Sequence, residues 1–581
     1  MTIYEWHDPA YDATLLSEGE LELRLKVPKP SGRVSLLFWN KYRTEQYGIQ
    51  RKTMIKWAES EQYGYYRIVL TGVESRIRYL QYTFEIEREG DKAWVNAEGL
   101  KSELAAKGSF SFSYAGDRDA VHAPEWIYDR VWYQIFPERF YNGDPSNDPQ
   151  GAEAWGGAPT RDNYMGGDLQ GILQKLDYLS DLGINAIYLN PIFAASSNHK
   201  YDTVNYLEVD PQFGTKEDLR KLVEACHRRD IKIVLDLVIN HCGYYHPFFQ
   251  DVVQNGEQSR YKDWFYIHEY PIALSDEQYD SVGYYRWMPK LRTSNPQVRE
   301  YVYEIVSFWQ KETGIDGWRI DVADEVEFSF LRELNAKVKE LDPNAFIIAE
   351  IWTDAKRLLL HGGVNTAMNY ELRTLLLDLA TDSTLTLDAF HDRLIGFLHR
   401  YSMKELHQMF NLLGSHDTER ILTRLGEDHN QLALLVAFQF ALPGNPVVYY
   451  GDEVGMTGEN DPGCRGCMPW EEQAAANDLT DLFKKWIQRK KADPVLQQGD
   501  VYLENGGDGM YIVKRVQDSK VWSLVVNLSG KSREVGELLR MSGLQGRTVT
   551  DPWSGAGVPA TDRLESGRCL IVQNYSEGAP I

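Results

Sequence analysis

The sequence predicts an α/β protein, a (β/α)8 TIM barrel with an N-terminal and a C-terminal β-sandwich. Short strand-like runs alternate with amphipathic helical patterns through the middle of the chain, as in α/β folds. Short Val-, Ile-, Tyr- and Phe-rich runs separated by turn residues fill both ends, which is typical of β-sandwiches. A chain of 581 residues is long enough for three such units.

The N-terminal sandwich is expected to span residues 1–122. Its strand-like runs include "ELELRLKV", "VSLLFW", "YYRIVL" and "RYLQYTFEIE". Runs of this kind, rich in β-branched and aromatic residues, pack as two facing sheets. From these residues alone, the unit is interpreted as a spacer or dimerisation domain with no ligand of its own.

The barrel is expected over residues 123–490. Its eight candidate strands lie at 131–136, 186–191, 231–241, 317–322, 346–352, 366–370, 410–417 and 446–453. Helical patterns separate most of them, for example at 168–183 and 215–230. Eight strands with intervening helices over roughly 360 residues match an enlarged (β/α)8 barrel. A doubly wound open sheet is the alternative, but it usually has fewer strands, and no Gly-rich phosphate loop follows the first strand.

Two segments complete the organisation. Residues 242–294 follow the third strand and are aromatic and polar, which indicates an inserted subdomain. Residues 491–581 return to short β runs, "GMYIVKRV" and "WSLVVNLSG", which predict the C-terminal sandwich.

Composition excludes several classes of partner. The net charge of -23 argues against nucleic acid, because phosphate binding needs clustered Lys and Arg. No apolar run approaches the length of a membrane span, so no membrane partner is expected. The N-terminal "MTIYEWHDPAYD" lacks the pattern of a signal peptide. Five cysteines do not make a disulfide framework in so long a chain, and reduced thiols favour a cytoplasmic location.

Polar side chains gather where the predicted strands end, which is where the active site of a (β/α)8 barrel lies. They are Asp236, Asn240 and His241 on the third strand, Arg319 and Asp321 on the fourth, Glu350 and Trp352 on the fifth, and His416 and Asp417 on the seventh. Any one of them fits an ordinary polar residue of a barrel. Their coincidence at one end predicts a catalytic site.

Carboxylates without a Ser or Cys nucleophile motif suggest acid–base chemistry, and glycosidic cleavage with retention uses two of them. Asp321 shares a strand face with Arg319, and a neighbouring cation lowers a carboxyl pKa, so Asp321 is expected to stay ionised as a nucleophile. Glu350 follows the apolar "FIIA", a setting that favours the protonated acid. A divalent-metal site including His241 and Asp236 is the rival, but Arg319 would compete with the cation.

Four segments in order, "DLVINH", "GWRIDVADE", "AEIW" and "LLGSHD", resemble the four short characteristic regions of the α-amylase superfamily of glycoside hydrolases. "MPKL" (288–291) resembles the region that marks the neopullulanase, cyclomaltodextrinase and maltogenic amylase group, as do "NHKYDT", "NHCGY", "MGGDLQGI" and "NPIF". The resemblance runs from about Val131 to Trp470, and the flanking β domains fit the architecture of the group.

The resemblance implies Asp321 as nucleophile, Glu350 as acid/base and Asp417 as transition-state stabiliser. The implied sugar-binding residues are His241, Arg319 and His416 before the cleaved bond, Tyr201 as a stacking platform, Trp352 as a wall beyond the bond, Glu325 on the acceptor side, and Asp461 and Arg465 farther out. From the residues alone, Glu325 equally fits a helix-start carboxylate, and the last two a structural loop pair.

An oxygen-rich stretch, "NGDPSND", suits a hard cation, although the same residue types also make turns. The resemblance implies a structural calcium site. Its residues would be Asn142, Asp144, Asn147, Asp148, Gly167 and Asp168.

The resemblance also implies a substrate class. It indicates a retaining hydrolase that cleaves the α-1,4 bonds of cyclomaltodextrins, pullulan and maltooligosaccharides, with α-1,6 bonds as a further candidate and with transglycosylation. An oligo-α-1,6-glucosidase or a dedicated glucanotransferase on the same scaffold is the alternative. A non-catalytic scaffold barrel is disfavoured because all three acids are present. A homodimer is expected, since the N-terminal sandwich of this group packs over the cleft of a neighbouring subunit.

Overall fold

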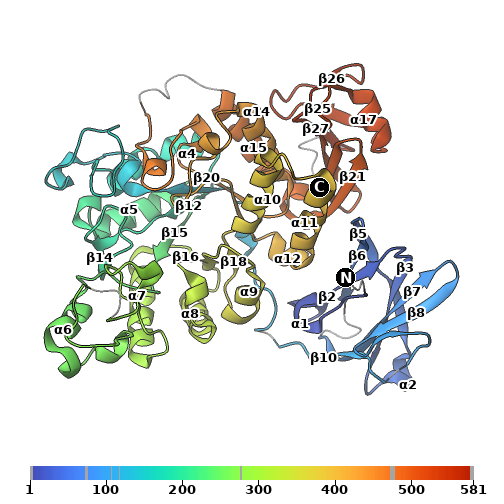
Figure 1. The fold of residues 1–581 in the computed structure, drawn as a ribbon, viewed down its shortest axis with the longest axis horizontal. Helices are drawn as coiled ribbons and strands as arrows, with labels where there is room; N and C mark the ends of the chain where they lie inside the picture. The colour runs from blue at the N-terminus through green and yellow to red at the C-terminus, as the bar shows by residue number, and fades with distance from the viewer. Residues whose placement is uncertain are drawn as a thin grey trace.

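Eight parallel strands form a barrel in a computed structural model that describes residues 4–71, 76–105, 107–116, 118–274, 278–470 and 478–575 (Figure 1). The strands are β11 (Trp132–Ile135), β12 (Ala186–Leu189), β15 (Lys232–Leu237), β16 (Gly317–Ile320), β17 (Phe346–Ala349), β18 (Thr366–Ala367), β19 (Phe410–Leu412) and β20 (Asn445–Tyr449). They pair in the order β18-β17-β16-β15-β12-β11-β20-β19, and a parallel bridge between Met368 and Phe410 joins the two ends. The predicted barrel is confirmed.

Helices follow the strands and surround the barrel (Figure 1). They are α3 (Leu169–Gln174), α4 (Leu176–Leu182), α5 (Lys216–His227), α7 (Pro296–Thr313), α8 (Phe328–Leu341), α9 (Lys356–Gly362), α10 (Tyr370–Thr381), α11 (Leu387–His399), α12 (Met403–Leu406), α13 (Ile421–Arg424), α14 (His429–Ala441), α15 (Asp478–Ala492) and α16 (Pro494–Gln498). The predicted helix at 215–230 is α5, which Thr215 and Asp218 begin as a capping box. The predicted helix at 168–183 is divided at Lys175 into α3 and α4.

Alternate side chains of the short barrel strands belong to two different hydrophobic clusters. Ile233 and Leu235 of β15 pack with the surrounding helices in the largest cluster of the chain. Val234 lies in a different cluster, with Trp132 and Ile348 from other barrel strands. Because successive side chains of a strand point to opposite faces, the second cluster fills the barrel interior. Arg319 has the interior phase on β16, between Trp318 and Ile320 of the outer cluster.

The N-terminal region consists of two antiparallel sheets that enclose their own core. One sheet contains β1 (Ala13–Ser17), β2 (Glu20–Pro28), β6 (Tyr63–Thr71) and β5 (Ile55–Glu59). The other contains β4 (Gln50–Thr53), β3 (Arg33–Asn40), β7 (Arg78–Arg88), β8 (Asp91–Asn96), β9 (Gly99–Lys101) and β10 (Phe110–Tyr114). Leu23 and Leu25 from one sheet and Leu36 and Phe84 from the other are buried in this core, as in a sandwich.

The insertion after β15 contains α6 (Pro247–Asn255) and short 3-10 turns, and it returns to the barrel where His241 bridges Lys290. Between β12 and α5 lies a two-stranded sheet of β13 (Phe193–Ala195) and β14 (Thr203–Val209). No helix in the described ranges is long and apolar enough to cross a membrane.

The C-terminal region is rich in sheet, as predicted. Its five-stranded sheet contains β21 (Asp500–Gly507), β22 (Met510–Gln517), β23 (Lys520–Asn527), β27 (Arg568–Gln573) and β25 (Thr548–Thr550). A two-stranded sheet of β24 (Arg533–Glu534) and β26 (Arg563–Leu564) and the helix α17 (Val535–Met541) accompany it. Arg67 of the N-terminal region donates to the Val501 carbonyl at 3.3 Å. The N-terminal and C-terminal regions therefore meet beside the barrel (Figure 1).

Candidate active site

Arg319 lies among three carboxylates at the ends of neighbouring strands. Its Nη1 atom is 2.9 and 3.0 Å from the two oxygens of Asp236 and 2.6 Å from Oδ1 of Asp321. Its Nη2 atom is 3.0 Å from Oε2 of Glu350. All four side chains are buried. The guanidinium therefore supplies the positive charge that the rival hypothesis assigned to a metal ion.

The protonation of Asp321 differs from the expectation based on Arg319 alone. Burial raises the pKa of Asp321 well above its ordinary value; Arg319 opposes this rise, and Glu350 and Asp236 add to it. Burial is the largest cause, and one guanidinium shared by three carboxylates does not offset it. Arg319 lowers the pKa of Asp321 in the predicted direction, but the net shift is upward. A raised pKa in this cluster suits a reaction that needs one protonated and one ionised carboxyl.

Glu350 is fixed by donors on both of its oxygens. Oε2 accepts the backbone N–H of Val322 at 2.8 Å, and Oε1 accepts the indole N–H of Trp352 at 3.3 Å. The backbone N–H of Glu350 donates to the carbonyl of Ile320 at 2.9 Å, which continues the pairing of β16 with β17. The register of two parallel strands thus brings Glu350 beside Asp321.

A hydrogen-bonded chain leads from the barrel to Asp236. Gln134 lies 2.7 Å from Nδ1 of His416, and Nε2 of His416 lies 2.6 Å from the hydroxyl of Tyr201. That hydroxyl donates to Asp236 at 2.9 Å. Burial, with help from Arg465, lowers the pKa of His416 well below its ordinary value, so the ring is neutral. With Gln134 donating to Nδ1, the ring proton resides on Nε2 and points toward Tyr201.

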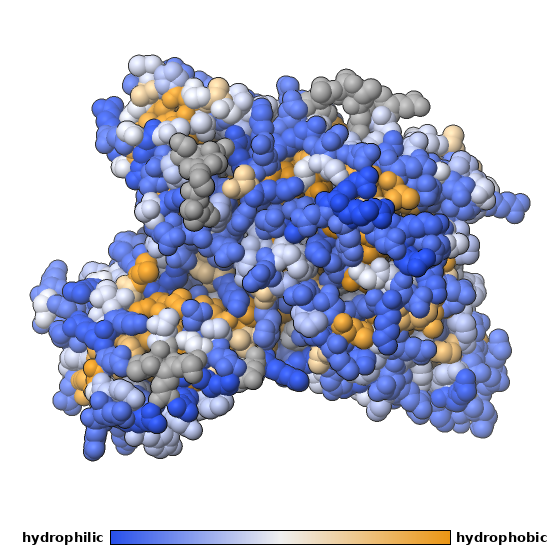
Figure 2. Space-filling view, turned by 180° about the vertical axis from the view of Figure 1, so that it is seen from behind, coloured by the Kyte–Doolittle hydropathy of each residue, from blue (hydrophilic) through white to orange (hydrophobic). Residues whose placement is uncertain are grey.

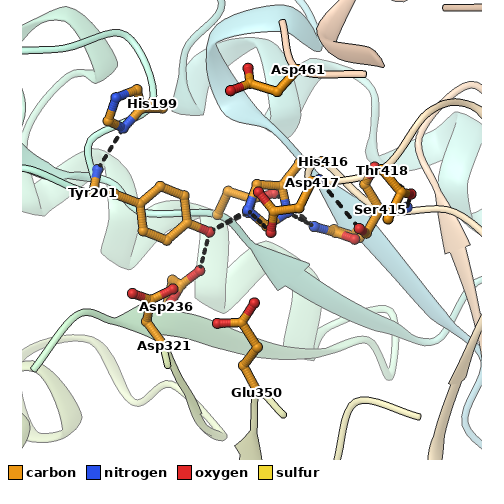
Figure 3. A network of polar contacts seen from close by, with 12 residues as sticks. His199, Tyr201, Asp236, Asp321, Glu350, Ser415, His416, Asp417, Thr418 and Asp461 are labelled. Atoms are coloured by element: carbon orange, nitrogen blue, oxygen red, sulfur yellow. Dashed lines mark hydrogen bonds and ion pairs between the residues drawn. The ribbon is translucent and has the colours of Figure 1, made fainter. Parts of the chain in front are cut away.

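Asp417 lies next to this network. Figure 3 shows Asp321, Glu350 and Asp417 gathered beside the Tyr201 ring. Arg465 donates to Asp417 at 3.3 Å and pairs with Asp461 at 2.9 Å. Burial raises the pKa of Asp417, although Arg465 and Arg319 oppose it. The structure thus joins the predicted outer loop directly to the third acid.

Trp352 and Glu325 lie at separate edges of the site. The Trp352 side chain is 47% exposed and stacks on Tyr370 with ring centroids 3.9 Å apart, so a ring remains available to a ligand. Glu325 accepts from Lys290 at 2.7 Å and from Asn240 at 3.2 Å. Lys290 belongs to the "MPKL" segment, so the insertion contributes to this edge.

His241 is buried near the strand ends, and neither of its ring nitrogens has a hydrogen-bond partner within the described part of the chain. Burial lowers its pKa to about 4, so it is neutral. A neutral imidazole with unused nitrogens fits a ligand contact.

Three supporting residues have no role in the predicted glycosidic site. Asp236 was placed at a strand end but not joined to Arg319, and Gln134 and Tyr370 were not singled out. A buried arginine needs charge partners, and this requirement was the one available signal for Asp236.

The predicted metal residues do meet around one loop. Asp168 begins α3 and accepts the backbone N–H groups of Gly143 and Asp144 at 3.1 and 2.8 Å. Asn142 donates to Asp148 at 2.8 Å, and the Gly166 backbone lies against this pair. The Oδ1 atoms of Asn142 and Asn147 are buried without a partner among the described residues. Unused oxygens fit a hard cation. No three His, Cys, Asp or Glu side chains in the described ranges are gathered closely enough to ligate an ion, so amides would be needed.

Comparisons with known protein families agree with the carboxylate site described above. The family model described as "Alpha amylase, catalytic domain" matches residues 134–499, and that of the "Alpha amylase, N-terminal ig-like domain" matches residues 5–116. The chain is 41% identical over 534 residues to a cyclomaltodextrinase of Geobacillus thermopakistaniensis, with 90% of each protein covered. It is 38% identical over 551 residues to neopullulanase 2 of Thermoactinomyces vulgaris, with 94% of this chain and 93% of the relative covered.

A comparison with solved structures leads to the same family. A solved cyclomaltodextrinase structure superimposes with a TM-score of 0.90 at 34% identity and covers 98% of this chain and 99% of its own. The resemblance stated from short motifs is confirmed over nearly the whole length. The chain belongs to the α-amylase family of glycoside hydrolases.

Proposed function

We propose that this enzyme is a retaining α-glucan hydrolase that acts on cyclomaltodextrins, pullulan and short maltooligosaccharides. The observation that carries the proposal is the contact of one buried guanidinium, that of Arg319, with both Asp321 and Glu350. Two carboxyl groups on adjacent strand ends suit a mechanism with one nucleophile and one acid. The names of the relatives, cyclomaltodextrinase and neopullulanase, support the substrate class.

In the first step, an oxygen of ionised Asp321 bonds to the anomeric carbon of the sugar. The glycosidic C–O bond breaks, and protonated Glu350 gives its proton to the leaving oxygen. In the second step, Glu350 takes a proton from water, whose oxygen attacks the same carbon and releases Asp321. Two inversions retain the α configuration. A sugar hydroxyl in place of water gives transglycosylation.

The remaining residues hold the sugar on either side of the bond. His241, His416 and Arg319 would contact the glucose unit that carries the anomeric carbon, and Tyr201 would pack beside it. Asp417 would stabilise the developing oxocarbenium charge as an anion. Trp352 and Glu325 would meet the acceptor sugar, and Asp461 with Arg465 would meet units farther out.

The test is hydrolysis of cyclomaltoheptaose followed by NMR of the first-formed reducing ends. We expect the α anomer first, and an Asp321→Asn protein whose turnover falls by several orders of magnitude. The β anomer first, or near wild-type turnover in the variant, would sink the mechanism. Initial rates on cyclomaltoheptaose, pullulan and starch rank the substrates.

We also propose calcium in the loop at 142–148. Asn142, Asn147, Asp144 and Asp148 would hold it, with Gly167 and Asp168 completing the site. The ion would supply structural cross-linking of the loop to the start of α3, away from the three acids. The unused amide oxygens support it.

We propose a homodimer in the cytoplasm. Many large hydrophobic side chains exposed on the described chain lie in the N-terminal sandwich, including Tyr42, Ile49, Ile55, Val69 and Tyr79. Figure 2 shows a mostly hydrophilic surface with hydrophobic patches over this region, at lower left. Such patches favour association. All five cysteines are buried thiols, as suits a reducing compartment. Light scattering that finds a monomer at working concentrations would contradict the dimer.

A further inference from the structure

The residue after Asp321 has a strained backbone. Val322 has φ 45° and ψ 48°, which is the left-handed region. Of the non-glycine residues with positive φ that the structure describes, Val322 alone is β-branched. A β-branched residue is a genuine outlier there, and such strain persists only where the surroundings impose it.

Side-chain packing does not account for this conformation. The Val322 side chain is only partly buried, and it belongs to none of the hydrophobic clusters found in the described chain. Its neighbour Val326 is, by contrast, a buried core residue with an extended backbone. The contacts of the peptide groups of Val322, rather than those of its side chain, therefore explain the strained conformation.

Those peptide groups connect the two strand ends. The N–H of Val322 donates to Oε2 of Glu350 at 2.8 Å, on the oxygen that also meets Arg319. The backbone on either side of Val322 is tied to Glu350 as well, since the Ile320 carbonyl accepts its N–H at 2.9 Å and the Ala323 N–H donates to its carbonyl at 3.1 Å. In an extended conformation successive N–H groups point to opposite sides, so the N–H groups of Val322 and Ala323 could not both reach Glu350.

We propose that Val322 is a positioning residue: its left-handed conformation lets the N–H groups of Val322 and Ala323 both bond to Glu350 and so sets how the two carboxyl groups face each other. The inference rests on the proposed function, in which Asp321 and Glu350 are nucleophile and acid. Val322 contacts neither the glycosidic bond that breaks nor the bond that forms at the anomeric carbon. It acts through Glu350. The carbonyl of Val322 also accepts the N–H of Glu325 at 3.1 Å, so the same turn begins the segment that leads to the acceptor side.

The test removes only the N–H. Replacing Val322 in the full-length protein by its α-hydroxy acid, through nonsense suppression, changes the amide to an ester and keeps the side chain. We expect kcat on cyclomaltoheptaose to fall on the order of tenfold to a hundredfold with little change in KM, because a hydrogen bond to a charged group is lost. We also expect the alkaline limb of the pH–rate profile to move to higher pH, because the ionised form of the carboxyl cluster loses a donor.

The matched control is the same ester at Val326, whose N–H donates to the Ala323 carbonyl at 3.3 Å and reaches no carboxylate. It should leave the alkaline limb where the wild type has it. If both esters give the same kcat and the same limb, Val322 does not position Glu350. Val322→Gly provides a second measurement, since glycine keeps the N–H and adopts positive φ freely. It should keep the limb unchanged and kcat within about threefold; a larger loss would assign the role to the side chain and overturn the proposal.

Different results would overturn the proposed function and this inference. Wild-type protein without cyclomaltoheptaose hydrolysis, or full activity in Glu350→Gln, would overturn the proposed function and this inference with it. An active wild type, an inactive Glu350→Gln protein and an ester at 322 that behaves like the ester at 326 would overturn this inference alone.

Discussion

One nitrogen of Arg319 donates to both carboxylate oxygens of Asp236, at 2.9 and 3.0 Å. Asp236 also accepts the hydroxyl groups of Tyr188 and Tyr201, at 2.6 and 2.9 Å. Burial raises the pKa of Asp236, and Arg319, Tyr188 and Tyr201 oppose that rise. We interpret Asp236 as the anchor that holds the guanidinium beside Asp321 and Glu350.

Asp236→Asn should therefore weaken both stability and catalysis. Removing one partner of a buried ion pair lowers the free energy of unfolding by roughly 3–5 kcal/mol, and Arg319 would lose its fixed position. Thermal melting and initial rates measure the two effects. Asp324→Asn, which neutralises an exposed acid in the same region, is the control. Wild-type melting and activity in Asp236→Asn would show that Arg319 does not depend on this anchor.

Asp321→Asn should gain stability relative to the wild type as the pH rises from 4 to 7. The pKa of Asp321 in the folded protein is raised above its unfolded value of about 4, so the folded state holds the proton more tightly. Such a group contributes stability below the unfolded pKa, and that contribution is lost as the pH rises through the folded pKa. Asparagine has no proton to lose. The Tm of the variant minus that of the wild type should therefore grow between pH 4 and pH 7, and a difference that is flat or shrinks contradicts the assignment.

Trp352→Ala should impair use of sugar acceptors more than cleavage. The half-exposed indole stacks on Tyr370 and offers an aromatic surface beyond the cleaved bond. Losing one aromatic contact costs about 0.5–1.5 kcal/mol, or roughly threefold to tenfold in the concentration of acceptor needed. Transfer to added maltose, measured by product chromatography, reports this. Trp352→Phe keeps a ring and should retain most transfer; equal loss in both variants would exclude stacking as the cause.

Chelation should lower the Tm if calcium binds the loop at 142–148. A ligand at a hundred times its Kd stabilises the folded state by about 2.7 kcal/mol, so EGTA should lower the Tm by roughly a few degrees, and added Ca²⁺ should restore it. Asn142→Ala removes one of the unused buried oxygens and should abolish the response. Added Mg²⁺ in place of Ca²⁺ is the control. An EGTA-insensitive wild type would refute the site.

Much of the site followed from short-range patterns. The eight strands were located because apolar runs and turns are local signals, and the strand ends then placed Asp321, Glu350 and Asp417 at one mouth. The raised pKa of Asp321 could not be predicted from the sequence, since it depends on Asp236 and Glu350, which are distant in the sequence. The left-handed conformation of Val322 did not follow either, because a valine in that region contradicts its local preference.

The sequence by itself determined which side chains share a strand face, because a period of two puts Arg319 and Asp321 on the same side of β16. Only the tertiary structure decided what they meet there. The register that pairs Ile320 with Ala349 brings Glu350 to the nucleophile, and the pairing of Asp236 with Arg319 brings the anchor. Barrel closure then places Asp417 of the seventh strand within reach. Burial at this meeting point, more than any one neighbour, raises the pKa of Asp321 and of Asp236.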